Sequence, residues 1–392
     1  MPVDGEPLVR RGDHGLRVRA VRERLVATGD LPGSAATESE FDDSVENAVR
    51  AFQQRRGMLV DGVVGPQTYR ALDGARWLLG DRILVHTPGH LMLGDDVSAL
   101  QQRLLGLGFS CGLVDGVFGR LTDSALRELQ RGVGLRPDGL AGPATLRALG
   151  QLARSVGGGA PQALREADRV RSAGPSLSGR VVVLDPGHST SEPGAQGGGL
   201  IEADVTLDLA RRVEGRLAAV GVQVVLTRGL TGNPTHLERA ELANTLNADL
   251  MVSLHCESLP RSPQARGVAS FFYGHTAHGG AWSVTGERLA TLVQRELVAR
   301  TDLVDCRSHP RAWDLLRRTQ MPAVRVEVGH LSNPGDAQRL GDPHFRDTVA
   351  EALVVAIQRV YLVGEDDATT GTWRVADVLA QAQAPPISHL PH

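Results

Sequence analysis

Two histidines and two glutamates hold positions from which they could act together. His188 follows an aliphatic run that an Asp-Pro-Gly turn ends, and His255 ends another aliphatic run. Glu202 lies in the first turn of a segment with helical periodicity, and Glu327 lies inside a β-branched run. Two imidazoles and one carboxylate, with one position left open, are the ligands that a catalytic zinc requires. Zinc activates water and polarises a carbonyl, so Glu327 as a proton carrier would complete a hydrolytic site.

Each of these residues has a simpler explanation when it is considered alone. A histidine such as His188 is often an ordinary turn residue, and a carboxylate such as Glu202 commonly interacts with the dipole of the helix that it begins. Glu327 is harder to explain in this way, because burying an unpaired acidic side chain is costly. The zinc hypothesis therefore depends on the four residues taken together.

Strands and helices alternate along this part of the chain, which predicts an α/β fold. We expect strands at 181–188, 222–228, 249–255 and 323–329, and helices that begin near 201, 236 and 345. Open α/β sheets place their sites at the carboxyl ends of the strands. The two histidines and the carboxylate at the helix start are therefore expected to meet at one edge of the sheet.

The motifs of this region occur in the order of a known family. They include Asp185-Pro-Gly-His188, Glu202-Ala-Asp-Val, Ser253-Leu-His255 and Glu327-Val-Gly. Residues 180–363 thereby resemble the zinc-dependent N-acetylmuramoyl-L-alanine amidases. The resemblance implies that His188, Glu202 and His255 bind Zn²⁺ and that Glu327 is the catalytic acid/base. It also implies a mostly parallel twisted sheet flanked by helices, and cleavage of the amide between the lactyl group of N-acetylmuramic acid and L-alanine.

Several residues depart from the pattern of that family. Cys256 and Glu257 follow the second histidine, where the family usually has a small residue and an asparagine. His330 replaces an aromatic residue, and it could be either a polar group in the cleft or a structural histidine. His275 and His278 are spaced for a metal, but their glycine-rich surroundings explain them equally well, and we do not count them as ligands.

The N-terminal part of the chain contains two copies of one pattern, at 8–78 and 88–152. Asp61-Gly-Val-Val-Gly-Pro in the first copy recurs as Asp138-Gly-Leu-Ala-Gly-Pro in the second. Each copy predicts three helices and resembles a three-helix peptidoglycan-binding domain. The first copy lacks the middle Asp-Gly turn of the second, so its ligand groove is less certain. The alternative is that both copies only pack against a partner or the catalytic domain.

Two further segments complete the expected organisation. Residues 153–178 predict an exposed linker before the amidase-like domain at 179–363. Residues 364–392 predict a flexible, acidic and threonine-rich tail with a brief helix at 374–382. Thr369, Thr370 and Thr372 are candidates for phosphorylation, where added charge could dock on an arginine cluster. An ordinary frayed C-terminus explains the same composition.

Composition excludes several classes of partner. The net charge of −3, from 42 basic and 45 acidic residues, gives no general attraction for nucleic acid. No stretch is apolar for long enough to span a membrane, and the N-terminal residues lack the apolar run of a signal peptide. Three widely spaced cysteines argue against a disulfide framework. We therefore expect a cytoplasmic location.

These features together favour one of three functions. The combination of two repeats, an amidase-like domain, no export signal and a threonine-rich end is similar to that of regulatory members of the family. That resemblance implies a cytoplasmic regulator of peptidoglycan precursor synthesis, which a Ser/Thr kinase switches and which acts on a partner enzyme such as the enolpyruvyl transferase of the first committed step. The alternative is an active zinc amidase that hydrolyses muramoyl-peptide precursors or peptidoglycan fragments. A third hypothesis is a passive wall-binding protein.

Overall fold

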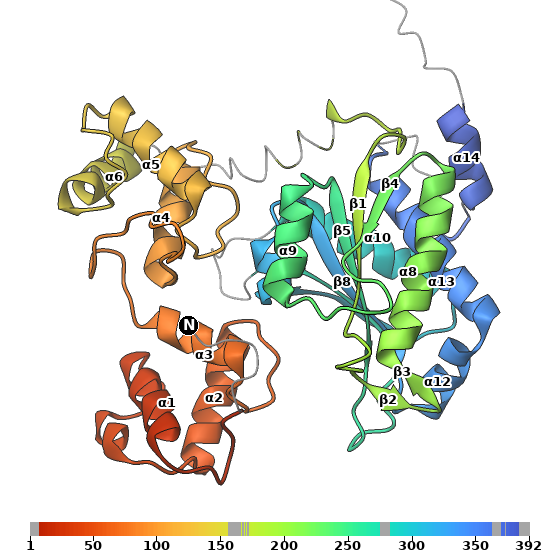
Figure 1. The fold of residues 1–392 in the computed structure, drawn as a ribbon, viewed down its shortest axis with the longest axis horizontal. Helices are drawn as coiled ribbons and strands as arrows, with labels where there is room; N and C mark the ends of the chain where they lie inside the picture. The colour runs from red at the N-terminus through yellow and green to blue at the C-terminus, as the bar shows by residue number, and fades with distance from the viewer. Residues whose placement is uncertain are drawn as a thin grey trace, which may run out of the picture. The chain divides into compact units, whose positions relative to one another are not determined.

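The computed structural model describes residues 8–155, 172–274, 283–362, 370–372 and 374–383, together with positions 166, 168 and 170. Contacts divide the chain into two compact units, one made mainly of residues 1–165 and the other mainly of residues 166–392 (Figure 1). None of the described helices is long and apolar enough to cross a membrane.

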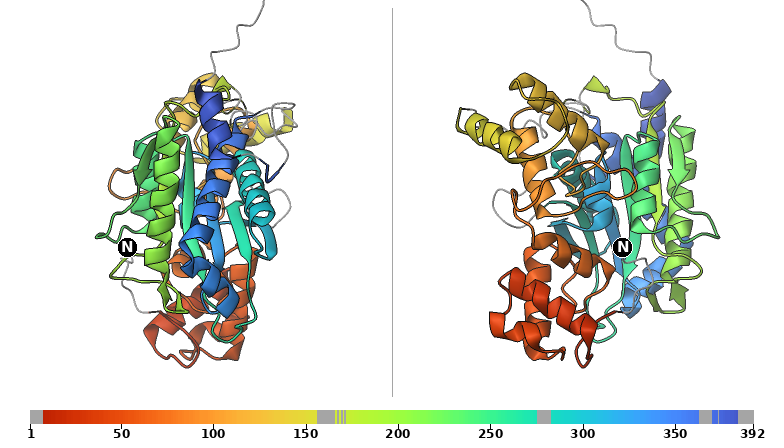
Figure 2. Two further views of the ribbon diagram at one scale, coloured as in Figure 1. Left: turned by 90° about the vertical axis from the view of Figure 1, so that its right-hand side faces the viewer. Right: turned by 60° about the vertical axis from the view of Figure 1, so that its left-hand side comes forward.

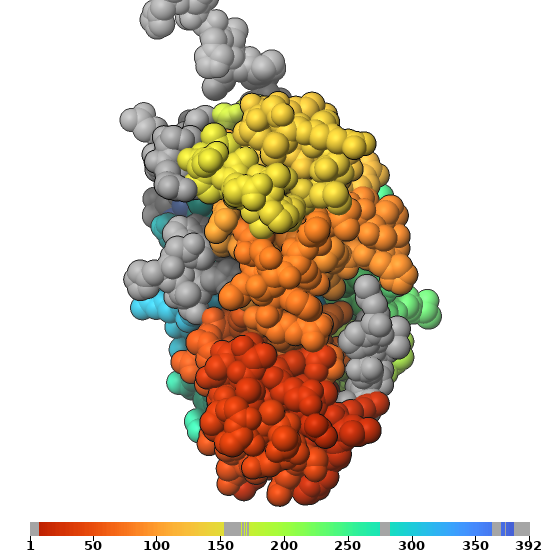
Figure 3. All heavy atoms as spheres, turned by 90° about the vertical axis from the view of Figure 1, so that its left-hand side faces the viewer, coloured from red at the N-terminus to blue at the C-terminus, as the bar shows by residue number. Residues whose placement is uncertain are grey.

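The first unit contains the two repeats, whose surfaces are coloured from red to yellow in Figure 3. Each repeat has its own hydrophobic core, centred on Leu25 and Phe52 in the first and on Leu104 and Phe118 in the second. The first repeat contains α1 (Leu16–Ala27), the 3-10 helix η1 (Gly33–Thr37), α2 (Asp43–Arg55) and α3 (Pro66–Ala75). The second repeat contains α4 (Asp95–Gly106), α5 (Arg120–Gly132) and α6 (Pro143–Ser155).

One hydrogen-bonded motif holds the Asp-Gly turns of the repeats. The side chain of Gln101 in α4 donates to Asp115 Oδ1 (2.7 Å) and Thr122 Oγ1 (3.1 Å), and accepts from the backbone N–H of Gly116 (2.9 Å). Gly116 has φ of 69°, a conformation that favours glycine. The same three contacts recur in two further sets, Gln53 with Asp61, Gly62 and Thr68, and Gln130 with Asp138, Gly139 and Thr145.

Arg22 explains how the first repeat folds without the middle Asp-Gly turn. It follows Val21 in α1 as Gln101 follows Leu100 in α4, and it is almost fully buried. Its guanidinium donates to the carbonyl oxygens of Ala35 (2.8 Å) and Glu40 (2.6 Å), and so holds the longer connection of this repeat. Arg22, a buried cation with several acceptors, therefore takes the place that Gln101 has in the second repeat.

The second unit is built on a six-stranded sheet of order β4-β1-β5-β8-β6-β7. Strands β4, β1, β5 and β8 are parallel neighbours, whereas β6 is antiparallel to β8. The expected α/β class and the mostly parallel sheet are confirmed. The strands are β1 (Val181–Pro186), β4 (Gln223–Leu226), β5 (Leu250–Glu257), β6 (Val268–Tyr273), β7 (Asp305–Arg311) and β8 (Ala323–His330), and a separate hairpin contains β2 (Gln196–Gly197) and β3 (Leu200–Ile201).

Helices lie on both faces of this sheet. On one face, α8 (Glu202–Ala219) lies beside α13 (Pro343–Val360), which also packs on α10 (Val284–Arg300) (Figure 2). On the other face lies α9 (His236–Thr245) (Figure 1). Two shorter helices are α11 (Asp314–Arg318) and α12 (Pro334–Gly341).

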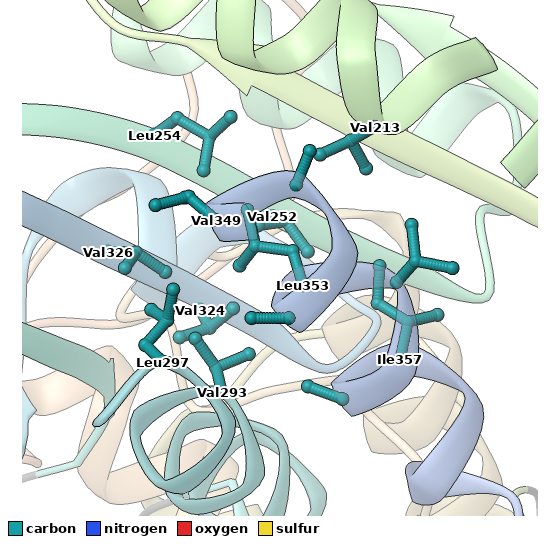
Figure 4. Packing of buried hydrophobic residues seen from close by; sticks show 14 of the residues in the cluster. Val213, Val252, Leu254, Val293, Leu297, Val324, Val326, Val349, Leu353 and Ile357 are labelled. Atoms are coloured by element: carbon teal, nitrogen blue, oxygen red, sulfur yellow. The ribbon is translucent and has the colours of Figure 1, made fainter. Parts of the chain in front are cut away.

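Alternation along the strands separates the core from the polar side chains. Val252 and Leu254 of β5 and Val326 of β8 point into the hydrophobic core under α10 and α13 (Figure 4). Because successive strand residues face opposite sides, Ser253 and His255, and likewise Arg325 and Glu327, lie on the face of α9. The sheet therefore presents its polar residues away from its core.

The expected C-terminal tail is helical in part. Residues Val375–Gln383 form α14, near the helix expected at 374–382. Val378 is only 1% exposed and packs in the core of the second unit, and α14 contacts α13. Residues 363–369 and half of the expected linker lie outside the described residues.

Candidate metal centre

The structure brings His188, Glu202 and His255 together. One ligand atom of each residue lies within 4.8 Å of the others. The Nδ1 atom of His255 is 2.8 Å from Glu202 Oε1, and the Nε2 atom of His188 is 3.3 Å from Glu202 Oε2. The two imidazole rings lie edge to face, with centroids 5.3 Å apart. Among the described residues, this is the cluster that offers a metal a His, Glu, His donor set.

Each ligand is placed by the end of a regular element. His188 follows β1, His255 lies near the end of the parallel neighbour β5, and Glu202 is the first residue of α8. His188 has φ of 57°, an unusual conformation for a residue with a side chain. Arg239 donates to the carbonyl oxygen of His188 (3.2 Å) and Arg228 to that of Gly187 (2.8 Å), so two arginines hold this turn.

Asp185 anchors the strand end behind His188. Its buried carboxylate accepts from Arg239 Nη1 (2.6 Å), Thr227 Oγ1 (2.5 Å) and Ser253 Oγ (2.6 Å). Burial opposes ionisation, but the Arg239 charge and these hydrogen bonds outweigh it and hold the pKa of Asp185 at about 2. A charged, fully bonded carboxylate thus ties β1, β5 and α9 together beneath the cluster.

Two glycines allow the ligands to approach. A Cβ atom at Gly187 would overlap the ring of His255, and one at Gly194 would come within 2.5 Å of Glu202 Oε2 and 2.6 Å of the His188 ring. Gly194 also has φ of 72°, which disfavours any side chain. The two imidazoles and the carboxylate therefore meet in a space that only glycine leaves open, and this donor set fits a zinc ion.

The ionisation of the ligands suits a divalent cation. Burial lowers the pKa of His188, and the Glu202 carboxylate offsets this effect only in part. Burial alone would raise the pKa of Glu202, but the hydrogen bond from His255 and the charges of both histidines hold it at about 2. At neutral pH His188 is therefore uncharged and Glu202 is a carboxylate, which are the forms that bind a metal.

Glu327 lies beside this cluster on β8. It is 5% exposed and pairs in strand register with His255 of β5. Its Oε1 atom accepts from Nε (2.8 Å) and Nη2 (2.6 Å) of Arg325, two residues earlier on the strand. Its Oε2 atom is buried without a hydrogen-bond partner among the described residues. The sequence interpretation identified Glu327 but missed Arg325, whose spacing of two on a strand was the available signal.

The residues that depart from the family pattern have different surroundings in the structure. Cys256 is buried, its backbone N–H donates to Glu202 Oε1 (3.0 Å), and burial raises the pKa of its thiol well above the usual value. Burial and the neighbouring Glu327 carboxylate raise the pKa of Glu257. The backbone N–H of His330 donates to Asp336 Oδ2 (3.0 Å). His275 and His278 lie outside the described residues.

Thr370, one of the candidate phosphorylation sites, contacts two helices of the second unit. The Oγ1 atom of Thr370 accepts from Arg295 Nη2 (2.7 Å) in α10 and from Arg359 Nη1 (3.1 Å) in α13. Thr372 is exposed, and Thr369 lies outside the described residues. The structure thus places one of the three threonines against two guanidinium groups.

Comparison with known families covers most of the chain. Residues 182–359 match the family model of N-acetylmuramoyl-L-alanine amidases, and residues 14–72 and 94–149 match that of a putative peptidoglycan binding domain. The chain is 48% identical over 389 residues to the N-acetylmuramoyl-L-alanine amidase CwlM of Mycobacterium tuberculosis, which covers 96% of this chain and 95% of that protein.

Further relatives match the second unit. The germination-specific N-acetylmuramoyl-L-alanine amidase of Bacillus subtilis is 34% identical over 47% of this chain and 81% of its own length. Among solved structures, the amidase AmiC2 of Nostoc punctiforme is 32% identical, with a TM-score of 0.42, over 46% of this chain and 96% of that one. Ami1 of Mycobacterium smegmatis is 26% identical, with a TM-score of 0.43, over 47% and 98%.

Proposed function

Because the chain belongs to the N-acetylmuramoyl-L-alanine amidase family, we propose that His188, Glu202 and His255 bind Zn²⁺ and that the site acts on muramoyl-peptides. The observation that carries this proposal is the convergence of the three ligand atoms within 4.8 Å, with Glu327 in register beside His255. The two repeats that match a peptidoglycan-binding model support peptidoglycan fragments or precursors as the ligand.

Each residue of the site has a separate role in amide hydrolysis. When bound, zinc supplies Lewis acidity toward water and toward the amide carbonyl. The carboxylate of Glu327 takes a proton from the attacking water and returns it to the amine of L-alanine as that amine leaves. Arg228 and Arg239 hold the His188 turn through the carbonyl oxygens of Gly187 and His188, and the carboxylate of Asp185 holds Arg239 in place.

A cleavage assay on the zinc-loaded full chain tests this function. Release of a peptide with a free N-terminal L-alanine from a muramoyl-peptide, detected by mass spectrometry, is the expected result. Glu327→Ala should abolish release while zinc remains bound, and Glu287→Ala, which changes an exposed acidic residue of α10, should leave it unchanged. If the wild-type protein with one bound zinc cleaves no muramoyl-peptide, hydrolysis is excluded.

A second function, regulation, is favoured by the surroundings of Thr370. We propose that the protein is cytoplasmic and controls a partner enzyme of peptidoglycan precursor synthesis after a Ser/Thr kinase modifies a threonine near the C-terminus. A phosphate on Thr370 would adjoin the guanidinium groups of Arg295 and Arg359, which already contact its Oγ1 atom. Arginine and phosphate form strong charge-assisted hydrogen bonds, so modification would fasten this segment to α10 and α13.

The regulatory function is tested with the enolpyruvyl transferase as the partner. Activation of that enzyme by the kinase-treated full chain should be lost in Thr370→Ala, with zinc content unchanged. Thr245→Ala, at an exposed position at the end of α9, is the control and should retain activation. A partner response that survives simultaneous replacement of Thr369, Thr370 and Thr372 by alanine would refute control through these threonines.

A further inference from the structure

Arg325 is the one cation that the structure shows hydrogen-bonded to the carboxylate of Glu327 among the described residues. Both Nε and Nη2 donate to the same oxygen, Oε1, at 2.8 and 2.6 Å. The Arg325 side chain is 22% exposed and that of Glu327 6%, so the pair is largely removed from water. Charge-assisted bonds in such surroundings fix geometry more firmly than exposed ion pairs do.

The two oxygens of Glu327 are therefore not equivalent. Oε1 is engaged by two N–H groups, whereas Oε2 is buried and has no hydrogen-bond partner among the described residues. An unpaired buried carboxylate oxygen is costly unless a further group meets it. Glu327 pairs in register with His255, so this oxygen belongs to a residue of the strand next to a metal ligand.

The strand explains why Arg325 can act on Glu327. Residues two apart on β8 lie on the same face of the sheet, and Val324 and Val326 on the opposite face are fixed in the hydrophobic core. The backbone of Arg325 is thus held between two fully buried core residues. Its charge also reaches the cluster, where it adds to the larger effect of burial in lowering the pKa of His188.

We propose that Arg325 is a positioning residue that holds Glu327 through Oε1 and thereby leaves Oε2 as the oxygen that exchanges the proton. This inference rests on the proposed amidase function. Arg325 itself takes no proton and contacts no reacting atom in this role. Without it, the Glu327 carboxylate could rotate about its terminal bond and present either oxygen, and a misplacement of about 1 Å can reduce a rate about 100-fold.

The experiment compares variants of the zinc-loaded full chain on a muramoyl-peptide. Arg325→Met should lower kcat about 10- to 100-fold with KM changed less than about twofold, because it disturbs a proton carrier and not substrate binding. Arg325→Lys should restore part of kcat, since an ammonium can still donate to Oε1. Arg216→Met is the control, because the Arg216 side chain is about as exposed as that of Arg325 and pairs with Asp347 on α13, and it should leave kcat unchanged.

A second measurement tests the interaction between Arg325 and Glu327 without relying on catalytic activity. Urea unfolding of the wild type, Arg325→Met, Glu327→Gln and the double variant should show that the two substitutions are coupled and not additive. Independent effects on unfolding would overturn the proposal, as would an Arg325→Met enzyme with wild-type kcat. If the wild type does not cleave, the amidase function fails, and the coupling measured in the cycle still decides whether Arg325 holds Glu327.

Discussion

The carboxylate of Glu202 lies 2.8 Å from the Nδ1 atom of His255, although the two residues are separated by 53 positions in the chain. One belongs to the first turn of α8 and the other to β5. Both side chains are about 3% exposed, so their contact is fixed by the packing of the sheet and not by the surface. Substitutions at this contact and around it should therefore change zinc affinity and the stability of the fold.

Replacing Glu202 by alanine should remove the metal from the protein. The substitution deletes the carboxylate that adjoins both histidines, and two imidazoles alone form an incomplete zinc site. We expect zinc affinity to fall by at least about 10- to 100-fold, as measured by calorimetric titration. Asp204→Ala, two residues later in α8, is the control. Full zinc occupancy of the Glu202 variant would show that the metal binds elsewhere.

Gly194→Ala should disturb the same site through the backbone. The new Cβ atom would press against Glu202 and the ring of His188, at a position with φ of 72°. The conformational cost alone is about 1–2 kcal/mol, and a loss of zinc affinity should accompany it. Gly229→Ala, where a Cβ atom meets nothing within 4 Å, should show neither effect. Unfolding in urea and zinc titration of both variants measure the difference.

Acid should destabilise the zinc-free protein through Asp185 and Glu202. The folded pKa of each is about 2, below the ordinary values of 3.8 and 4.5. Their stabilising contribution is therefore complete above about pH 4.5 and is lost as the pH falls toward 2. The midpoint of urea unfolding should drop across this window, and more gradually in Asp185→Asn. An identical slope in that variant would show that Asp185 does not titrate with unfolding.

Gln101→Ala should destabilise the second repeat. It leaves the buried backbone N–H of Gly116 without its partner and removes one bond of the Thr122 hydroxyl, which still donates to the carbonyl oxygen of Val117. Each unsatisfied group costs about 1–3 kcal/mol, so the repeat should unfold at a lower urea concentration. Gln102→Ala, at the next and exposed position of α4, should change little. Equal unfolding curves for the two variants would show that the hydrogen bonds of Gln101 do not stabilise the repeat.

The metal cluster could be predicted from the sequence because its residues end regular elements. His188 and His255 close aliphatic strands, and parallel neighbouring strands end at one edge of a sheet. β7 escaped prediction because its sequence, Asp-Cys-Arg-Ser-His-Pro-Arg, has no apolar alternation. The contact between Arg325 and Glu327 needed the structure, since two side chains that share a strand face still choose their rotamers by what surrounds them.

In the N-terminal repeats, too, features set by neighbouring residues were predicted, whereas a contact between residues far apart in the chain was not. The turns at Asp61 and Asp138 were expected from their Asp-Gly sequences, because glycine supplies the positive φ. The burial of Arg22 was not expected, since its acceptors on Ala35 and Glu40 lie 13 and 18 residues away. A long connection held by one side chain leaves no periodic signal in the sequence.

The hydrogen bonds of Gln53, Gln101 and Gln130 tie each Asp-Gly turn to the helices on either side of it. Glutamine on one helix, the turn itself and a threonine at the start of the next helix occur in a fixed order three times. The bonds of each set join one helix, the following turn and the start of the next helix, so each set is local in the chain. In the first repeat, Arg22 holds the corresponding connection through the carbonyl oxygens of Ala35 and Glu40 instead, so a different side chain closes the same part of the fold.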